Sequence, residues 1–230
     1  MRLRNKQSGI VILPPLLPLE NARQYFDSVR RDWNQSHACS RLKAIIEPAL
    51  SQCNKVVAFA LGEFALEAQK GWHKRSAYQH AMLLTLGDAL ASHHADKDGS
   101  ICYAQDPAYN DHDKRLFETY GVNVLDDPVG FLRVDDSTIV LSCAPNVPVR
   151  SIIVDIAKPV LLILDKPNPL IAGTLRYVSF KHRLTMSLTA FSTDPESPRM
   201  RDLLEIHYRA FDFSGDATLF GDLAIHIRQS

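Results

Sequence analysis

The sequence contains few cysteines, and none of them is spaced as a metal-binding or redox pair. The four lie far apart at Cys39, Cys53, Cys102 and Cys143, with no C-x-x-C spacing. A chain of 230 residues needs no disulfide framework, so we expect reduced thiols, a cytoplasmic location and no structural zinc. Entry into the nucleus is left open by the sequence.

An excess of charge of one sign and a long apolar run are also missing. The 26 basic side chains balance the 26 acidic ones, so the chain has no long-range field for a polyanion and duplex nucleic acid is not an expected partner. No apolar run approaches the roughly 20 residues of a membrane span, and no membrane association is expected. The apolar stretch 9–19 follows basic residues as in a signal peptide, but its prolines favour a strand or a docked extended arm.

Hydrophobic residues make up 46% of the chain, which is enough for one large core. Apolar runs of strand length alternate with amphipathic helical patterns, and such βαβ crossovers imply a parallel sheet covered by helices on both faces. We therefore predict an α/β, Rossmann-like three-layer fold with a mostly parallel sheet and a C-terminal antiparallel extension. The predicted single domain, 1–230, consists of an N-terminal helical cover (1–54), a Rossmann core (55–168) and a C-terminal β/α extension (169–230).

The expected elements follow from hydrophobic periodicity and local capping signals. Ser76 and Gln79 are spaced as a capping box at the start of one helix, and Gly121 is placed to end another. The stretch 192–198 is polar and indicates a loop. Strands are predicted at 55–61, 101–104, 122–125, 138–143, 160–164, 177–180, 184–191 and 219–227, and helices within 21–52 (two) and at 76–92, 111–120, 147–157 and 200–208.

Candidate ligand-binding residues follow the first predicted core strand, because open α/β sheets bind ligands beyond the carboxyl ends of their strands. Gly62, Glu63 and Phe64 lead into a loop that ends at a helix N-terminus with Lys74 and Arg75. This arrangement favours a phosphate or carboxylate held by helix amides. A solvated surface loop explains the same residues.

Further candidates follow the next strands. Asp106 and Pro107, with Tyr109 nearby, stand where Rossmann-like proteins hold ribose hydroxyls, although an Asp-Pro turn explains them equally well. Cys143 is a candidate nucleophile or a small buried hydrophobe at a strand end. Asn146 is placed to line the same edge and to cap the helix predicted from residue 147.

The nine histidines raise the possibility of a metal or haem site. His93, His94 and His112 stand near Asp111 and Asp113, but their spacing matches no ligand pattern and no metal is expected. Established hydrolase, metalloprotease and Walker motifs are absent from the sequence. The catalytic residues are therefore unknown, and the sequence favours a protein that is not an enzyme while leaving the question open.

Three groups of residues together resemble a known family. Ala60-Leu61-Gly62-Glu63-Phe64 ends a strand, Arg75-Ser76 with Tyr78, Gln79 and Ala81 opens a helix, and Asp106-Pro107-Ala108-Tyr109 forms a turn. This combination is similar to the core signature of the sensitivity-to-red-light-reduced (SRR-like) domain and covers roughly 55–168. The stretch 138–149 resembles the fungal-type version. Two departures are Ser142-Cys143-Ala144, where many members carry Pro-His-Cys, and Asp165-Lys166-Pro167, where they carry an Asn-Ser turn.

The resemblance implies a regulatory protein, since the family is linked to light signalling and circadian rhythm in plants and to haem metabolism in animals. We expect a ligand-sensing or protein-interaction module that takes a small anionic or nucleotide-like ligand or a regulatory protein partner. The alternatives are a nucleotide- or S-adenosylmethionine-dependent transferase, a haem-binding regulator and a scaffold with no ligand. The candidate ligand-binding residues are Gly62, Glu63, Phe64, Arg75, Ser76, Gln79, Asp106, Pro107, Tyr109, Cys143 and Asn146.

Overall fold

The main sheet of the computed structural model has seven strands in the order β5-β4-β3-β6-β7-β9-β8. The structure describes residues 3–4, 11–12, 16–65, 72–93, 101–166, 194 and 197–229. Strands β3 to β7 are parallel to one another, whereas β9 is antiparallel to both β7 and β8. In chain order the five parallel strands are arranged 3-2-1-4-5, which is the Rossmann arrangement. The predicted fold class is confirmed. The bounds are β3 (Lys55–Phe59), β4 (Cys102–Gln105), β5 (Val122–Val124), β6 (Thr138–Ser142), β7 (Leu161–Asp165), β8 (Tyr208–Asp212) and β9 (Leu223–Arg228).

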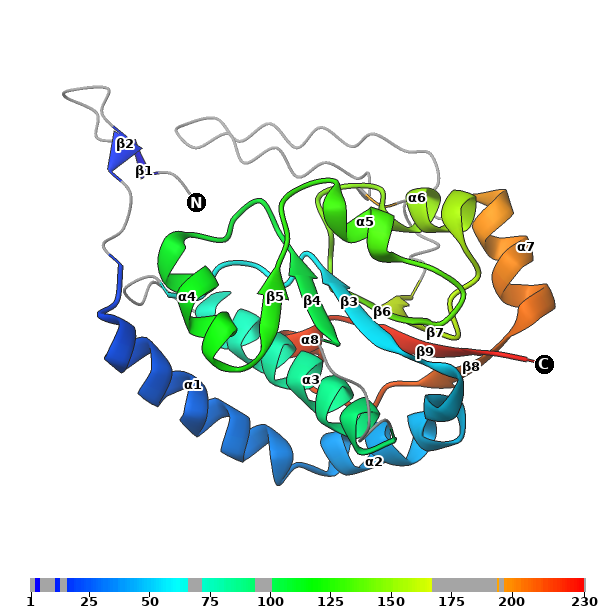
Figure 1. Cartoon of the computed structure of the whole chain (residues 1–230), viewed down its shortest axis with the longest axis horizontal. Coiled ribbons are helices and arrows are strands. Elements are labelled where there is room, and N and C mark those ends of the chain that lie inside the picture. The colour runs from blue at the N-terminus through cyan, green and yellow to red at the C-terminus, as the bar shows by residue number, and fades with distance from the viewer. Residues whose placement is uncertain are drawn as a thin grey trace, which may run out of the picture.

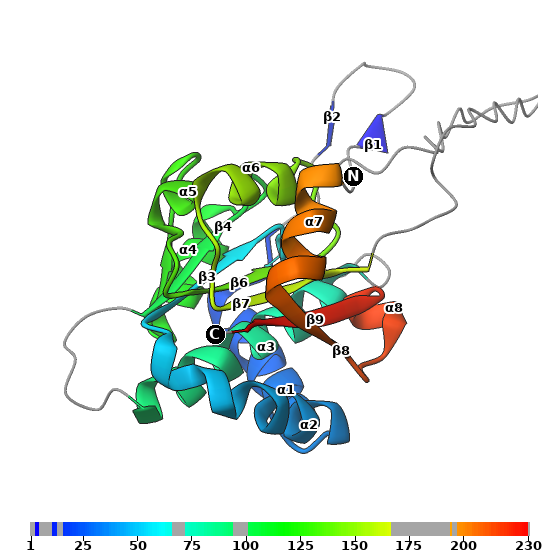
Figure 2. The same cartoon turned by 90° about the vertical axis from the view of Figure 1, so that its right-hand side faces the viewer.

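Helices cover both faces of this sheet (Figures 1 and 2). One face packs against α1 (Leu19–Asn34), α2 (His37–Ile46), α3 (Trp72–His93), α4 (Asp111–Thr119) and α8 (Ala217–Phe220). The other packs against α5 (Val129–Arg133), α6 (Val149–Ile156) and α7 (Pro198–His207). Figure 2 shows α5, α6 and α7 above the sheet and α1 and α3 below it.

Alternation along each central strand produces two separate cores. In β3, Val56 and Ala58 belong to the core under α1 to α4, whereas Val57 and Phe59 belong to the core under α5 to α7. Each strand is therefore apolar on both faces, which explains why the core strands are continuous apolar runs in the sequence.

The N-terminal helices α1 and α2 pack into the core under α1 to α4 through aromatic and polar contacts. Trp33 of α1 is buried, and its indole Nε1 donates to Thr85 Oγ1 of α3 at 2.8 Å. Two turns earlier in α1, the ring of Phe26 packs edge-on against Phe117 of α4. A 3-10 segment, Glu47–Gln52, leads from α2 to β3. Before α1, the Leu17 amide donates to the Ala65 carbonyl at 3.0 Å, and β1 (Leu3–Arg4) pairs with β2 (Val11–Ile12).

The structure corrects the predicted start of one helix. Helix α3 begins at Trp72, so Ser76 lies inside it and does not cap it. Its hydroxyl instead donates to the Gly62 carbonyl, and the Gln79 amide donates to the Leu219 carbonyl. The sequence did not predict α5, α8 or β8. The strands predicted at 177–180 and 184–191 lie outside the described residues.

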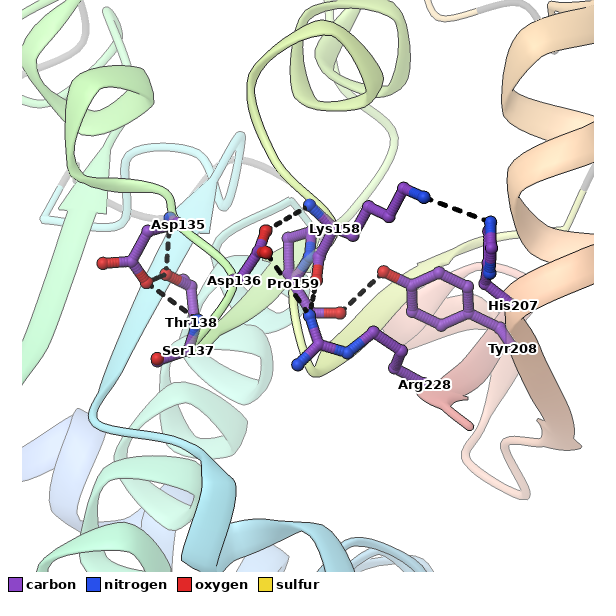
Figure 3. Close-up of polar contacts among 9 residues, drawn as sticks. All are labelled: Asp135, Asp136, Ser137, Thr138, Lys158, Pro159, His207, Tyr208 and Arg228. Carbon is purple, nitrogen blue, oxygen red and sulfur yellow. Dashed lines mark hydrogen bonds and ion pairs between the residues drawn. The ribbon is translucent and has the colours of Figure 1, made fainter. Parts of the chain in front are cut away.

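The amino edge of the parallel strands is joined by polar contacts (Figure 3). Thr138, at the start of β6, exchanges two hydrogen bonds of 2.9 Å with Asp135: its Oγ1 donates to Oδ1 and accepts from the Asp135 amide. Lys55, at the start of β3, reaches the same carboxylate at 2.5 Å. Tyr208 donates its hydroxyl to the Pro159 carbonyl at 2.6 Å, and Arg228 bonds the Lys158 carbonyl.

No helix within the described ranges has the length and apolar character needed to cross a bilayer.

Candidate functional site

The carboxyl ends of β3 and β6 lie side by side, because Phe59 pairs with Ser142 in the parallel register. Strand β3 leads to β4 on one side and is flanked by β6 on the other. Strand order reverses between β3 and β6, and this topological switch point is where Rossmann-like folds bind ligands. We use the term switch point for 60–63 and 142–146.

Backbone strain is concentrated at this point. Ala60 has φ 58° and Ala144 has φ 48°, and these are the positive φ values found at non-glycine residues of the described chain. A left-handed conformation costs a residue with a Cβ roughly 1–2 kcal/mol. Gly62, with φ 77°, takes a similar conformation without that cost. Strained backbone of this kind clusters at functional sites and persists where the surroundings hold it in place.

Two side chains hold the Gly62 turn. The Gly62 amide donates to Asp106 Oδ2 at 2.7 Å, and the Gly62 carbonyl accepts from Ser76 Oγ at 2.8 Å. The second oxygen of Asp106 accepts from the Ala108 amide at 2.8 Å. Three of the sequence candidates, from the β3–α3 connection, α3 and the β4–α4 connection, therefore meet here. Within the described residues each Asp106 oxygen accepts one backbone hydrogen bond, and a carboxylate oxygen has two lone pairs.

A buried histidine supports the turn from behind. The Nδ1 of His80 donates to the Ser76 carbonyl at 2.7 Å, so Nε2 accepts from the Tyr109 hydroxyl, also at 2.7 Å. Burial lowers the pKa of His80 to about 3. The ring is therefore neutral, and it stacks on Phe117 with centroids 4.0 Å apart. Tyr109 acts here as a structural partner of α3.

The hydroxyl of Ser142 is the unusual polar group at the switch point. The residue is 1% exposed, and its Oγ has no hydrogen-bond partner in the part of the chain that the structure describes. Buried hydroxyls are nearly always paired, since an unpaired one costs about 1–3 kcal/mol. An orphaned hydroxyl at the end of a central strand therefore marks a position where a bound group can supply the missing partner.

Charged groups surround the neighbouring end of β7. The Ala144 amide donates to Asp165 Oδ2 at 2.5 Å. Burial raises the pKa of Asp165, while that hydrogen bond and the positive charges of Arg150 and Arg75 act in the opposite direction. Arg75 thus reaches this edge from the first turn of α3. Burial also raises the pKa of the Cys143 thiol, which keeps it protonated and unreactive at neutral pH.

The remaining candidates lie in different surroundings. Phe64 is fully buried against Phe26 and Phe117, and Pro107 and Asn146 are exposed. Half-buried Glu63 has its pKa raised by burial and by the nearby charges of Asp113 and Asp106.

The predicted cap of the α6 helix is corrected by the structure. Helix α6 begins at Val149, its N-cap is Pro148, and no side chain of that cap residue bonds to the helix. Asn146 therefore lies two residues too early to cap it. The Arg150 amide in the first turn instead donates to the Asp194 carboxylate at 2.9 Å.

The histidines are engaged in separate contacts. His93 pairs with Glu47 at 3.0 Å, and His112 Nδ1 donates to the Leu17 carbonyl at 2.9 Å. Asp113 accepts from the Phe64 and Ala65 amides. Within the described ranges, no three metal-binding side chains gather in one place. His94 lies outside those ranges.

A comparison with protein-family models finds one that matches residues 31–227, described as the SRR1 domain. The chain belongs to the SRR1-domain family. The resemblance found in the core sequence is thereby confirmed, and the match extends it in both directions, to α1 and to β9. A search of curated proteins finds no match to the chain.

Four residues of this SRR1 domain were missed as site candidates by sequence reasoning. Ser142 was noted only as a departure from the family pattern, and Asp165 only as part of a turn. Arg150 is a charged residue in the first turn of the otherwise mostly apolar α6, where its sequence gives no sign that it is buried. Asp194 has no signal either, because its partner Arg150 stands 44 residues away.

Proposed function

We propose that this SRR1-domain protein is a regulatory module that senses a small anionic or nucleotide-like ligand at the switch point between β3 and β6. The observation that carries the proposal is the buried Ser142 hydroxyl, which has no partner in the described chain. It stands at the strand end where Rossmann-like sheets place their ligands. The strained backbone at Ala60 and Ala144 on either side supports the same position.

The residues around this hydroxyl suit a polar ligand. The Gly62 turn, with its positive φ, lets a ligand approach the backbone closely. Asp106 already bonds this turn and has lone pairs left for a hydroxyl donor such as a ribose. Arg75 adds positive charge near Asp165. A nucleotide would find an acceptor, a donor and a cation within one edge of the sheet.

A sensor is favoured over a transferase because the candidate reactive group is poorly suited to chemistry. The Cys143 thiol is 2% exposed, and burial raises its pKa, so little thiolate is available. A haem role is less favoured, since His93 and His112 bond to separate protein groups.

A protein-interaction role is the second candidate, and a different observation favours it. Large apolar side chains are exposed on the α5–α7 side of the sheet, with Leu132 76% and Ile206 68% exposed. Exposed apolar groups of this size on one layer are common where a partner binds.

The proposal is tested by a thermal-shift screen with adenine nucleotides, nicotinamide dinucleotides, S-adenosylmethionine, phosphosugars and haem. A ligand that binds the native state and not the unfolded chain raises the free energy of unfolding, and the increase grows with the logarithm of the ligand concentration above its Kd. We expect at least one ligand to raise the Tm by several degrees and Ser142→Ala to reduce that rise. Ser137→Ala, next to the other end of β6, is the matched control and should keep it. Absence of any shift in the wild type would move the assignment to the protein-interaction role.

A further inference from the structure

The first turn of α6 is capped by a carboxylate from a distant part of the chain. Asp194 Oδ1 accepts from the Arg150 amide at 2.9 Å, and both residues are buried, with 3% and 6% exposure. The first turn contains no acidic residue, and the N-cap Pro148 offers no side-chain acceptor. Asp194 therefore supplies the negative charge that the positive end of this helix attracts.

The guanidinium of Arg150 is not fully matched by that carboxylate. Its Nη1 donates to the Asp194 carbonyl at 3.0 Å, and its Nη2 bonds the Asp165 carbonyl. The carboxylate oxygen Oδ2 stands 3.8 Å from Nε, beyond hydrogen-bond distance. A buried arginine is satisfied best by a bidentate oxyanion, and here two of its contacts are to neutral carbonyls.

The orphaned hydroxyl of Ser142 lies on the same side of the sheet. Its neighbour Val140, two residues earlier in β6, belongs to the core under α5 to α7, and side chains two apart along a strand share a face. Continuing the β6–β7 register places Ser142 beside Leu164. The next residue of β7, Asp165, provides the carbonyl that Arg150 bonds. The hydroxyl without a partner and the buried cation therefore both lie at the carboxyl ends of β6 and β7.

We propose that Arg150, the first turn of α6 and the Ser142 hydroxyl form a subsite for an oxyanion, a phosphate or sulfate group, and that the Asp194 carboxylate occupies this subsite in the ligand-free protein. This inference rests on the proposed function, because it assigns the anionic end of the ligand to the α6 side of the switch point. Asp194 is then an internal competitor: an arriving oxyanion replaces its carboxylate and gains the hydroxyl that Asp194 does not use.

A structural cap and an internal competitor predict opposite results for Asp194→Asn. The amide keeps an oxygen for the Arg150 amide but removes the negative charge. Isothermal titration of the full chain with inorganic phosphate, adenosine monophosphate and adenosine compares the wild type with the variant. We expect both phosphates to bind Asp194→Asn about tenfold more tightly, since the competing charge is worth roughly one charge-assisted bond. Adenosine should bind both proteins equally.

The matched control is Asp155→Asn, which neutralises an exposed aspartate of α6 paired with Arg199 of α7. It should leave all affinities unchanged. Phosphate affinity in Asp194→Asn equal to or below that of the wild type would overturn the subsite, even if the wild type binds a nucleotide and the proposed function holds. Tighter phosphate binding by the variant, without any ligand for the wild type, would keep the subsite and reject sensing. If Asp194→Asn strengthens the binding of inorganic phosphate but not of adenosine monophosphate or adenosine, free phosphate is the source of the anion.

Titration of the wild type with sulfate keeps the inference testable if Asp194→Asn does not fold. Burial raises the pKa of Asp194 to about 6, so its charge is lost between about pH 7 and pH 5, whereas sulfate keeps its charge. Among the described residues, the charges of Arg150 and Asp165 act on Asp194, and burial also raises the pKa of Asp165. Burial and Arg150 lower the pKa of His226 to about 4, so it stays neutral. Sulfate affinity should rise as the pH falls, and a constant or falling affinity would overturn the subsite.

Discussion

The two ends of strand β6 carry the same kind of side chain in opposite states. At the amino end, the Thr138 hydroxyl exchanges two hydrogen bonds with Asp135. At the carboxyl end, the Ser142 hydroxyl has no partner among the described residues, and the backbone two residues later is left-handed. Both hydroxyls are buried. The difference lies in their surroundings: polar contacts secure the amino edge, whereas the carboxyl edge carries the strained backbone and the unpaired hydroxyl on which the proposed binding site rests.

The amino edge also fastens the antiparallel extension to the core. The Lys158 ammonium donates to Nε2 of His207 at 3.1 Å, and the Arg228 amide donates to the Val160 carbonyl at 2.9 Å (Figure 3 draws the side chains of Lys158, His207 and Arg228). These contacts join the start of β7 to the end of α7 and the end of β9. At the carboxyl edge, the corresponding link is made by Asp194 and Arg150, which we infer to be displaceable.

The largest expected effect is a loss of folding stability at acid pH, caused by buried His80 beneath the carboxyl edge of the sheet. His80 has a folded pKa of about 3 because it is buried, against a value of 6.5 in the unfolded chain. As the pH falls below 6.5, only the unfolded state takes up this proton, so stability declines, by about 3 kcal/mol at pH 4. Urea unfolding at pH 7 and at pH 4 measures the decline. His80→Gln should remove about 3 kcal/mol of the acid loss, whereas exposed His37→Gln should keep it. Buried His226, whose pKa is about 4, adds a share of the acid loss that both variants retain. An unchanged acid loss in His80→Gln would contradict the assignment.

The next effect breaks the amino edge. Thr138→Val keeps the shape of the side chain and leaves the Asp135 amide without its acceptor. We expect a loss of about 1–3 kcal/mol in the free energy of unfolding, measured as a lower urea midpoint at pH 7. A variant as stable as the wild type would show that this edge does not contribute as described.

A smaller effect of opposite sign sharpens the comparison at the carboxyl edge. Ala60→Gly relieves a left-handed Cβ and should stabilise the protein by about 0.5–1 kcal/mol, after the entropy cost of glycine is included. Ala210→Gly, at an exposed position of β8 with ordinary strand backbone, is the control and should destabilise by a similar amount. Urea midpoints of both variants decide the matter. Destabilisation by both would mean that Ala60 is not strained.

The smallest expected loss of stability is that of Ser142→Ala in the ligand-free protein. Because this hydroxyl has no described partner, its removal breaks no hydrogen bond and relieves the cost of burying an unpaired hydroxyl, so the free energy of unfolding should stay the same or rise. A loss as large as that of Thr138→Val would reveal a hidden partner and remove the contrast between the two edges.

The core strands were predictable because they are buried on both faces. The predicted strand 160–164 differs from β7 by one residue at each end, and 138–143 exceeds β6 by one. Continuous apolar runs indicate strands that are buried on both faces, so the consecutive βαβ units and the mostly parallel sheet could be predicted from the sequence. Strand β8 was missed because only Tyr208 is buried in it, so its sequence lacks the alternation of a half-buried strand.

The site was predictable only where its partners are close to strand ends. Gly62 and Asp106 were candidates because each follows a core strand, and the structure joins them at 2.7 Å. The capping roles given to Ser76 and Asn146 were wrong because local spacing does not reveal distant partners. Ser76 bonds to Gly62, and Asp194, from a stretch predicted only as a polar loop, takes the place of Asn146 at α6. Long-range side-chain contacts of this kind leave no periodic signal.

Hydrogen exchange of the backbone amides tests most directly whether the carboxyl edge of the sheet, and not the amino edge, binds a ligand. It is measured on the wild type with and without the screened ligand that gives the largest thermal shift. A ligand at the switch point should slow exchange at 60–65 and 143–150 and leave 135–138 and 158–160 unchanged, because bound groups protect the amides they contact. Protection confined to the amino edge, or spread equally over both edges, would contradict the account.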